Sequence, residues 1–130
     1  MDRSENMRRI RSKDTNPELF IRRLIFKMGY RYKLYGKNLP GKPDLVFAGR
    51  KKVIFIHGCF WHQHRNCIDS HIPKTNRDYW VAKLNKNKVR DKKNQVEIKK
   101  LGWSFFIVWE CKMKNTSKLS REIKTFLEKS

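Results

Sequence analysis

The most informative segment of the chain is Val53-Ile54-Phe55-Ile56-His57, which continues into Gly58-Cys59-Phe60-Trp61-His62-Gln63-His64-Arg65-Asn66-Cys67. Its opening apolar run predicts a central strand that is buried on both faces. The residues that follow are rich in imidazole and thiol groups, which are the preferred ligands of zinc. A neutral imidazole also serves as a general base near pH 7. We therefore expect a central strand that delivers reactive groups from its C-terminal end.

Outward from this strand, the hydrophobic pattern predicts helices and strands in alternation. Asn16-Pro17-Glu18 is typical of a helix start, and Gly29 of its end. Strands are expected at 30–35, 44–48 and 103–109, and helices at about 79–100 and 118–128. This order predicts an α/β fold with a mixed central sheet flanked by helices. We expect residues 17–130 to form one domain and residues 1–16 a basic arm, either a frayed end or a clamp on DNA phosphates.

The amino-acid composition limits the classes of molecule that the protein is expected to bind. The 130 residues carry a formal charge of +20 and an isoelectric point near 10.3, which favours nucleic acid first and an acidic membrane surface second. No apolar run approaches the roughly 20 residues that span a bilayer, and the N-terminus lacks a signal-peptide core. Three cysteines are an odd number, which argues against a closed disulfide framework. We expect a cytoplasmic, monomeric protein.

Four potential metal ligands accompany the central strand: Cys59, His64, Cys67 and Cys111. Cys111 ends a strand that can run beside the strand ending at His57. A Cys₃His set of this kind is a common closed structural zinc site. The alternative is three unrelated thiols and a surface histidine.

Candidate catalytic groups lie at the strand ends. Asp44 opens a strand next to the one that ends at His57, so a Mg²⁺-binding carboxylate and a histidine base are expected together, which suits phosphodiester hydrolysis. Glu18 and Asp91 are further candidates from the first and second predicted helices of the domain. The alternatives are a turn-capping role for Asp44, a helix-terminal charge for Glu18 and an ion pair for Asp91. The aromatic residues Phe60, Trp61 and Trp80 serve either as core or as a surface that stacks on bases.

Over nearly its whole length the chain resembles the very short patch repair endonucleases, which act on T:G mismatches. The matching segments are Ile10–Glu18, Pro40–Phe47, Val53–His62, Tyr79-Trp80, Lys86-Asn87, Asp91, Leu101-Gly102-Trp103 and Val108-Trp109-Glu110-Cys111. The resemblance implies a fold similar to that of type II restriction endonucleases. It also implies a Mg²⁺-dependent nick in one strand of double-stranded DNA, on the 5′ side of the mismatched thymine, at the start of very short patch mismatch repair. Mismatch-repair proteins are the further partners that it implies.

The same resemblance assigns roles to residues. Asp44 and the main-chain carbonyl of Ile56 are implied as Mg²⁺ ligands, and His62 as the general base. The supporting catalytic groups are His57, Asp91 and Glu18. The structural zinc ligands are Cys59, His64, Cys67 and Cys111. The aromatic residues Phe60, Trp61 and Trp80 resemble a wedge that enters the base stack, and the arm with Arg11 and Lys13 resembles a segment that closes over the opposite groove.

Two other functions remain open from the sequence. One is a zinc-stabilised nicking endonuclease with a different, non-mismatch DNA target. The other is a non-catalytic DNA-binding protein, against which the presence of Asp44, His57 and His62 argues.

Overall fold

The computed structural model describes residues 16–129, and the chain divides into two compact units between Arg31 and Tyr32. In the first unit, helix α2 (Asn16–Lys27) carries Ile21 and Ile25 four residues apart, which places them on one face. The chain leaves the helix through Gly29, whose φ of +99° suits a residue without a β-carbon. The helix predicted from Asn16 to Gly29 is thereby confirmed.

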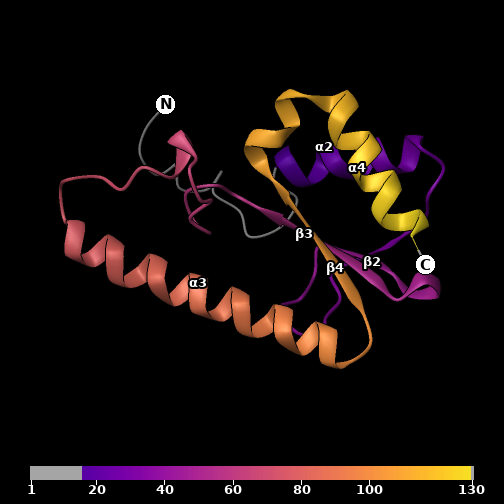
Figure 1. Cartoon of the computed structure of the whole chain (residues 1–130), viewed down its shortest axis with the longest axis horizontal. Helices are drawn as coiled ribbons and strands as arrows, with labels where there is room; N and C mark the ends of the chain where they lie inside the picture. Colours follow the sequence, from indigo (N-terminus) through magenta and orange to yellow (C-terminus); the bar gives the residue numbers. More distant parts are fainter. Residues whose placement is uncertain (1–15, 130) are drawn as a thin grey trace. The chain divides into compact units, whose positions relative to one another are not determined.

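The second unit contains a four-stranded sheet in the order β1-β2-β3-β4 (Figure 1). Its strands are β1 (Lys33–Leu34), β2 (Leu45–Phe47), β3 (Lys52–His57) and β4 (Ser104–Trp109). The first three strands pair antiparallel, whereas β3 and β4 pair parallel. The predicted mixed sheet is thus confirmed. The strand expected at 30–35 is reduced to the two residues of β1, because Tyr35 takes a positive φ of 55° and turns the chain out of the sheet.

Two helices cover opposite faces of this sheet (Figure 1). Helix α3 (Arg77–Lys100) lies in the crossover between β3 and β4, and α4 (Thr116–Glu128) follows β4. Neighbouring residues of β4 point to different faces: Phe105 packs on the cluster that includes Ile98 of α3, and the Phe106 ring lies 5.4 Å from the Phe126 ring of α4. The helices predicted at 79–100 and 118–128 are therefore confirmed, each beginning two residues earlier than expected.

The core beneath α3 is a small apolar cluster. It consists of Val46, Val53, Phe55 and Ile98, with Leu39, Trp103, Phe105 and Ile107 packed around it. Five of the six residues of β3 are buried, including its first residue, Lys52. The expectation that this strand is central and buried on both faces is confirmed. Because most of the strand is buried, reactive groups can reach a substrate only from its C-terminal end.

A buried lysine ties the sheet to the end of α4. The Nζ atom of Lys52 donates to the carbonyl oxygens of Phe126, Leu127 and Lys129, and Arg50 donates to the Leu127 carbonyl oxygen at 3.0 Å. The last carbonyl groups of a helix lack partners within the helix and carry partial negative charge, so basic groups at this position stabilise it.

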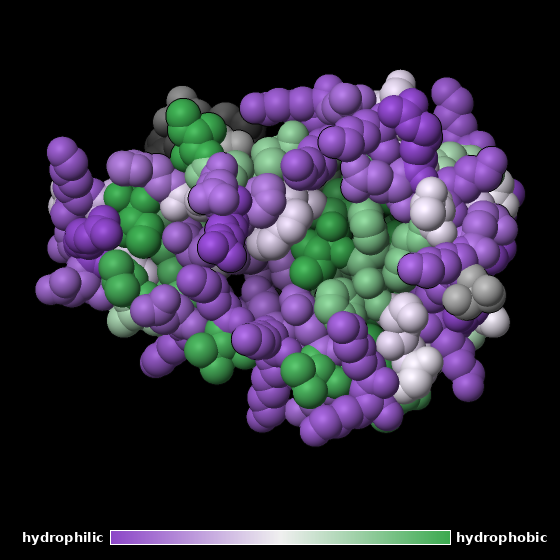
Figure 2. Space-filling model, in the orientation of Figure 1, coloured by the Kyte–Doolittle hydropathy of each residue, from purple (hydrophilic) through white to green (hydrophobic). Residues whose placement is uncertain are grey.

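Hydrophilic residues cover most of the face shown in Figure 2. Most lysines of α3, including Lys83, Lys86, Lys92 and Lys93, are exposed or half-buried at the surface. Among the described residues, no helix combines the length and the apolar character required to cross a bilayer.

Candidate active site and metal centre

The segment after β3 is wound into consecutive tight turns. The backbone N–H groups of His62, Gln63 and His64 donate to the carbonyl oxygens of Gly58, Phe60 and Cys59 respectively, at 2.9–3.2 Å. Gln63 and Asn66 both take positive φ angles, a conformation that asparagine tolerates better than most residues. These turns bring the side chains of Cys59, His64 and Cys67 to one place.

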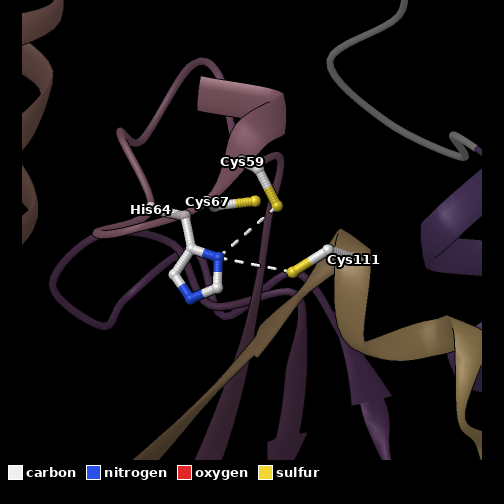
Figure 3. A group of neighbouring side chains, drawn as sticks. All are labelled: Cys59, His64, Cys67 and Cys111. Atoms are coloured by element: carbon white, nitrogen blue, oxygen red, sulfur yellow. Dashed lines mark hydrogen bonds between the residues drawn. The ribbon is translucent and has the colours of Figure 1, made fainter. Parts of the chain in front are cut away.

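The parallel pairing of β3 with β4 supplies the fourth member of this group. His57 pairs with Trp109, the last residue of β4. Cys59 and Cys111 each follow two residues after this pair, so the two sulfur atoms leave the same edge of the sheet side by side. Cys111 comes from the turn after β4, whereas the other three residues come from the turns after β3 (Figure 3).

The geometry of these four side chains fits a tetrahedral ion. The ligand atoms of Cys59, His64, Cys67 and Cys111 all lie within 4.8 Å of one another. His64 Nδ1 lies 3.7 Å from the Cys59 sulfur and 3.3 Å from the Cys111 sulfur (Figure 3). Zinc bonds of ordinary length and tetrahedral angle place a sulfur and a nitrogen ligand about 3.6 Å apart. The donor set and its spacing therefore suit zinc.

The Cys59 thiol of this cluster resists ionisation on its own. Burial raises the pKa of the Cys59 thiol to about 12, and hydrogen bonding with the Cys111 and Cys67 side chains adds to this rise. Burial, and then the nearby Lys112 charge, lower the pKa of His64, which favours the neutral imidazole that binds metals. A divalent cation would compensate the thiolate charge that burial penalises.

A second group of polar side chains forms where β3, the following turns and α3 meet. His57, His62 and Asp91 offer ligand atoms that lie within 4.8 Å of one another. The rings of His57 and His62 stack at 3.8 Å with an angle of 7°, and His62 Nδ1 lies 2.6 Å from Asp91 Oδ2. Because the two ring planes are nearly parallel and 3.8 Å apart, in-plane lone pairs of the two rings cannot both point directly at one ion. The arrangement therefore suits proton transfer better than metal binding.

The buried member of this group stays neutral. Burial, reinforced by the charge of His62, lowers the pKa of His57 to about 3, although Asp91 acts in the opposite direction. At neutral pH, His57 therefore packs against His62 without adding positive charge. Asp91 accepts from or pairs with Nδ1 of His62, which orients that ring and leaves its Nε2 atom for other partners.

Asp44 lies next to the central strand. Its Oδ2 atom accepts a hydrogen bond of 2.6 Å from the backbone N–H of Ile56. The carboxylate that sequence analysis singled out is thus in contact with the residue whose carbonyl group was expected to share its metal ion. Among the described residues, the two clusters above include neither Asp44 nor Glu18.

Three other predicted site residues come from the first 31 residues of the chain. Glu18 is in the first turn of α2, in the first unit, where its Oε2 atom accepts a 3.0 Å hydrogen bond from Arg22. Arg11 and Lys13 fall outside the described residues.

Three aromatic side chains gather at the surface beside the histidines. The rings of Phe60, Trp61 and Trp80 contact one another edge to face, with centroid separations of 5.2–5.9 Å. Trp61 remains 41% exposed. The first two residues come from the turns after β3 and the third from the start of α3, so the group is not part of the apolar cluster beneath that helix.

Sequence reasoning did not assign three residues that support these groups. Gln63 Nε2 donates to the Phe60 carbonyl oxygen at 2.7 Å, and Asn87 Nδ2 donates to that of Trp61 at 3.0 Å. Trp109 contacts both His57 and His64. The contacts of Gln63 depend on a local turn and those of Asn87 and Trp109 on tertiary packing, and no motif in a single sequence indicates them.

The exposed lysines of α3 and two clusters that could hold a metal ion or a proton, at the C-terminal ends of β3 and β4, are compatible with a nuclease. The model of the family "DNA mismatch endonuclease Vsr" matches residues 1–68. The chain is 46% identical to the "Type II nicking enzyme V.NmeAIP" of Neisseria meningitidis, over 94% of this chain and 91% of that protein.

Two further relatives agree with this match. The "Type II nicking enzyme V.XorIIP" of Xanthomonas oryzae is 40% identical, with 95% of this chain and 90% of the relative covered. The "DNA mismatch endonuclease Vsr" of Escherichia coli is 39% identical, with 95% and 78% covered. The chain therefore belongs to the Vsr family and is a DNA endonuclease.

Proposed function

We propose that this endonuclease nicks one strand of double-stranded DNA on the 5′ side of the thymine in a T:G mismatch and so starts very short patch repair. The convergence of His57, His62 and Asp91 from three separate elements is the observation that carries the proposal. The E. coli relative, which is named a mismatch endonuclease, supports this choice of substrate. The fold is then expected to be that of the type II restriction endonucleases, acting with mismatch-repair partners on cytoplasmic DNA.

In this proposal His62 is the general base. Its Nδ1 atom is occupied by Asp91 at 2.6 Å, so Nε2 is the atom that takes a proton from the attacking water. Stacking against neutral His57 restrains the rotation of the ring. A base that is held in one orientation before substrate arrives avoids a loss of entropy in the transition state.

Asp44 and the main-chain carbonyl of Ile56 would hold Mg²⁺, because both supply the oxygen ligands that this ion prefers. The contact between the Asp44 carboxylate and the Ile56 N–H supports the pairing of these two residues. When bound, the ion would polarise the scissile phosphate and stabilise the leaving oxygen. Glu18 is proposed to assist near this metal, a role that depends on how the first unit meets the second.

The aromatic group is proposed as the mismatch sensor. Insertion of Phe60, Trp61 and Trp80 would unstack one base step, which costs a few kcal/mol and costs least at a mismatch. The exposure of Trp61 supports it as the member that enters first. The arm with Arg11 and Lys13 would close on the opposite groove and add phosphate contacts, which set position without reading sequence.

Zinc is proposed as a structural ion held by Cys59, His64, Cys67 and Cys111. Four protein ligands close the coordination shell, and the fit of the nitrogen–sulfur distances supports this assignment. The ion would fix the turns that carry the aromatic residues and His62.

The decisive experiment is nicking of end-labelled T:G duplexes with Mg²⁺. Asp44→Ala should abolish nicking while mismatch binding persists, because the change removes a metal ligand and no aromatic contact. Glu122→Ala, which removes an exposed carboxylate from α4, is the matched control and should nick normally. Full activity of Asp44→Ala would refute the assignment.

One alternative keeps the chemistry and changes the target. Two relatives are named type II nicking enzymes, and these names specify no mismatch; the alternative is therefore a nicking enzyme with a different DNA target. A panel of matched and mismatched duplexes in varied sequence contexts separates the two, since only the mismatch enzyme requires the T:G pair.

A further inference from the structure

Trp109 joins the two polar clusters described above. One face of its indole stacks on the His64 ring, with centroids 4.2 Å apart and an angle of 12°. The same side chain contacts the His57 ring edge to face, with centroids 5.2 Å apart and an angle of 78°. Because His57 in turn stacks on His62, four rings form a continuous series, His64–Trp109–His57–His62. One end of the series, His64, is a candidate metal ligand, and the other end, His62, is the proposed general base.

Packing fixes the His57 ring more than hydrogen bonding does. Its Nδ1 atom is buried and has no hydrogen-bond partner within residues 16–129, and the side chain is only 5% exposed. Three rings surround it, those of Phe55, His62 and Trp109, at centroid distances of 5.9, 3.8 and 5.2 Å. Of these, Trp109 is the largest and belongs to the strand that pairs directly with His57.

We propose that Trp109 is a positioning residue for the nicking reaction, which holds His57 in the plane that keeps His62 stacked and directed toward Asp91. The indole is itself held by the His64 ring, so the turns around the cysteines brace the acid–base group through one side chain. The inference rests on the proposed role of His62 as the base. Without the indole, the His57 ring gains rotational freedom, and the His62 ring loses the surface that restrains it.

The test compares Trp109→Leu and Trp109→Phe with a matched pair, Trp103→Leu and Trp103→Phe. Trp103 lies at the other end of β4, packed on the cluster that includes Ile98, and has no ring contact with a histidine among the described residues. Each variant is measured for single-turnover nicking at saturating T:G duplex, for duplex affinity, for zinc content, and for the histidine ring resonances by NMR.

We expect Trp109→Leu to slow nicking by about 10- to 100-fold, the scale on which misplaced catalytic groups act, with duplex affinity within about twofold of the parent. The His57 and His62 ring resonances should shift together, and Trp109→Phe should give smaller changes in the same direction. The Trp103 variants should leave these resonances in place. Because Trp109→Phe keeps a ring at the site, it carries the test even if Trp109→Leu does not fold.

Three results would overturn the proposal. The first is that the His57 ring resonances are unchanged in Trp109→Phe. The second is that Trp109→Leu nicks DNA at the same rate as Trp103→Leu. The third is that the loss of nicking rate follows the loss of zinc alone. Failure of the underlying function is recognised separately: if His62→Ala nicks at the parent rate, His62 is not the base, whereas the NMR comparison still decides whether Trp109 positions His57.

Discussion

At the scale of single residues, the site depends on one imidazole being kept out of water. His57 lies at the end of the buried strand β3 and under three other rings, and this burial lowers its pKa to about 3. Exposed Trp61 shows the opposite strategy a few residues later. Within five residues, the chain therefore carries one ring that burial protects from protonation and one ring that is exposed to solvent.

The low pKa of His57 predicts how stability depends on pH. The unfolded chain binds a proton at His57 near pH 6.5, whereas the folded chain does so only near pH 3. Stability from this group is therefore fully present above about pH 6.5 and is lost as pH falls, by at most about 1.4 kcal/mol per unit. Denaturant unfolding of the parent and of His57→Phe between pH 7 and pH 5 measures it. The parent should lose stability relative to His57→Phe as pH falls, because the variant lacks this titrating group; a stability difference that does not change with pH would contradict the prediction.

Spacing in the sequence indicated that the cysteines gather, because they follow the ends of two neighbouring strands, whereas the roles of His62 and Asp91 came from the family resemblance. Cys59 and Cys111 are equally far beyond a paired position, and β-strand ends can be located from apolar runs. The partners of Trp109 and Asn87 could not be foreseen, since they depend on ring orientation and helix rotation. Glu18 could not be placed because α2 belongs to the first unit.

At the scale of elements, the strands differ in how strongly the sequence specifies them. The run from Val53 to His57 is apolar enough to be recognised without a partner, and β3 extends over it. The segment 30–35 has an alternating pattern but forms an edge strand of two exposed residues. Alternation is a weaker signal at an edge, where one side of the strand has no neighbour to enforce its length.

The hydrogen bonds of Lys52 join strand β3 to helix α4. The sequence could not reveal them, because the acceptors are the last main-chain carbonyl groups of α4. Lys52→Met should lower the free energy of unfolding by about 2 kcal/mol, since charge-assisted hydrogen bonds to a helix end are lost inside the protein. Lys124→Met removes an exposed lysine from the same helix and should have little effect. Chemical denaturation of both variants checks this, and equal losses would show that the buried contacts contribute nothing specific.

The turns after β3 and the first turn of α3 act together on DNA in the proposed function. Trp61→Ala should weaken binding to a T:G duplex more than binding to the matched duplex, because the ring is worth most where stacking is already weak. Fluorescence anisotropy with both duplexes measures the ratio. Leu101→Ala, which truncates an exposed apolar side chain at the far end of α3, is the control. An equal loss on both duplexes would rule out a wedge.

For the molecule as a whole, the formal charge of +20 makes repulsion between like charges a cost that burial of the apolar residues must outweigh. A structural metal ion would add to the stability of the folded state. The expected mixed sheet flanked by helices is present, and the likeness to restriction endonucleases stays a prediction.

We predict that the purified protein holds one zinc ion per chain and that chelation lowers its melting temperature by several degrees or more. His64→Ala should lose zinc and show the same low melting temperature before chelation. His71→Ala, which removes the exposed histidine outside both clusters, should keep its zinc. Metal analysis and thermal unfolding give both readouts, and a zinc-free parent protein would disprove the site.

The equal spacing of Cys59 and Cys111 beyond the β3–β4 pair has a consequence for the order of folding. Three of the four proposed ligands lie in one short segment, but the fourth is separated from them by the whole of α3 and β4. During synthesis from the N-terminus, the first three emerge long before the chain can complete the cluster. Contacts so distant in sequence close slowly, so metal capture should mark the last cooperative step, when β4 docks beside β3. A time course of metal uptake during refolding would then report when the parallel pair of β3 and β4 forms.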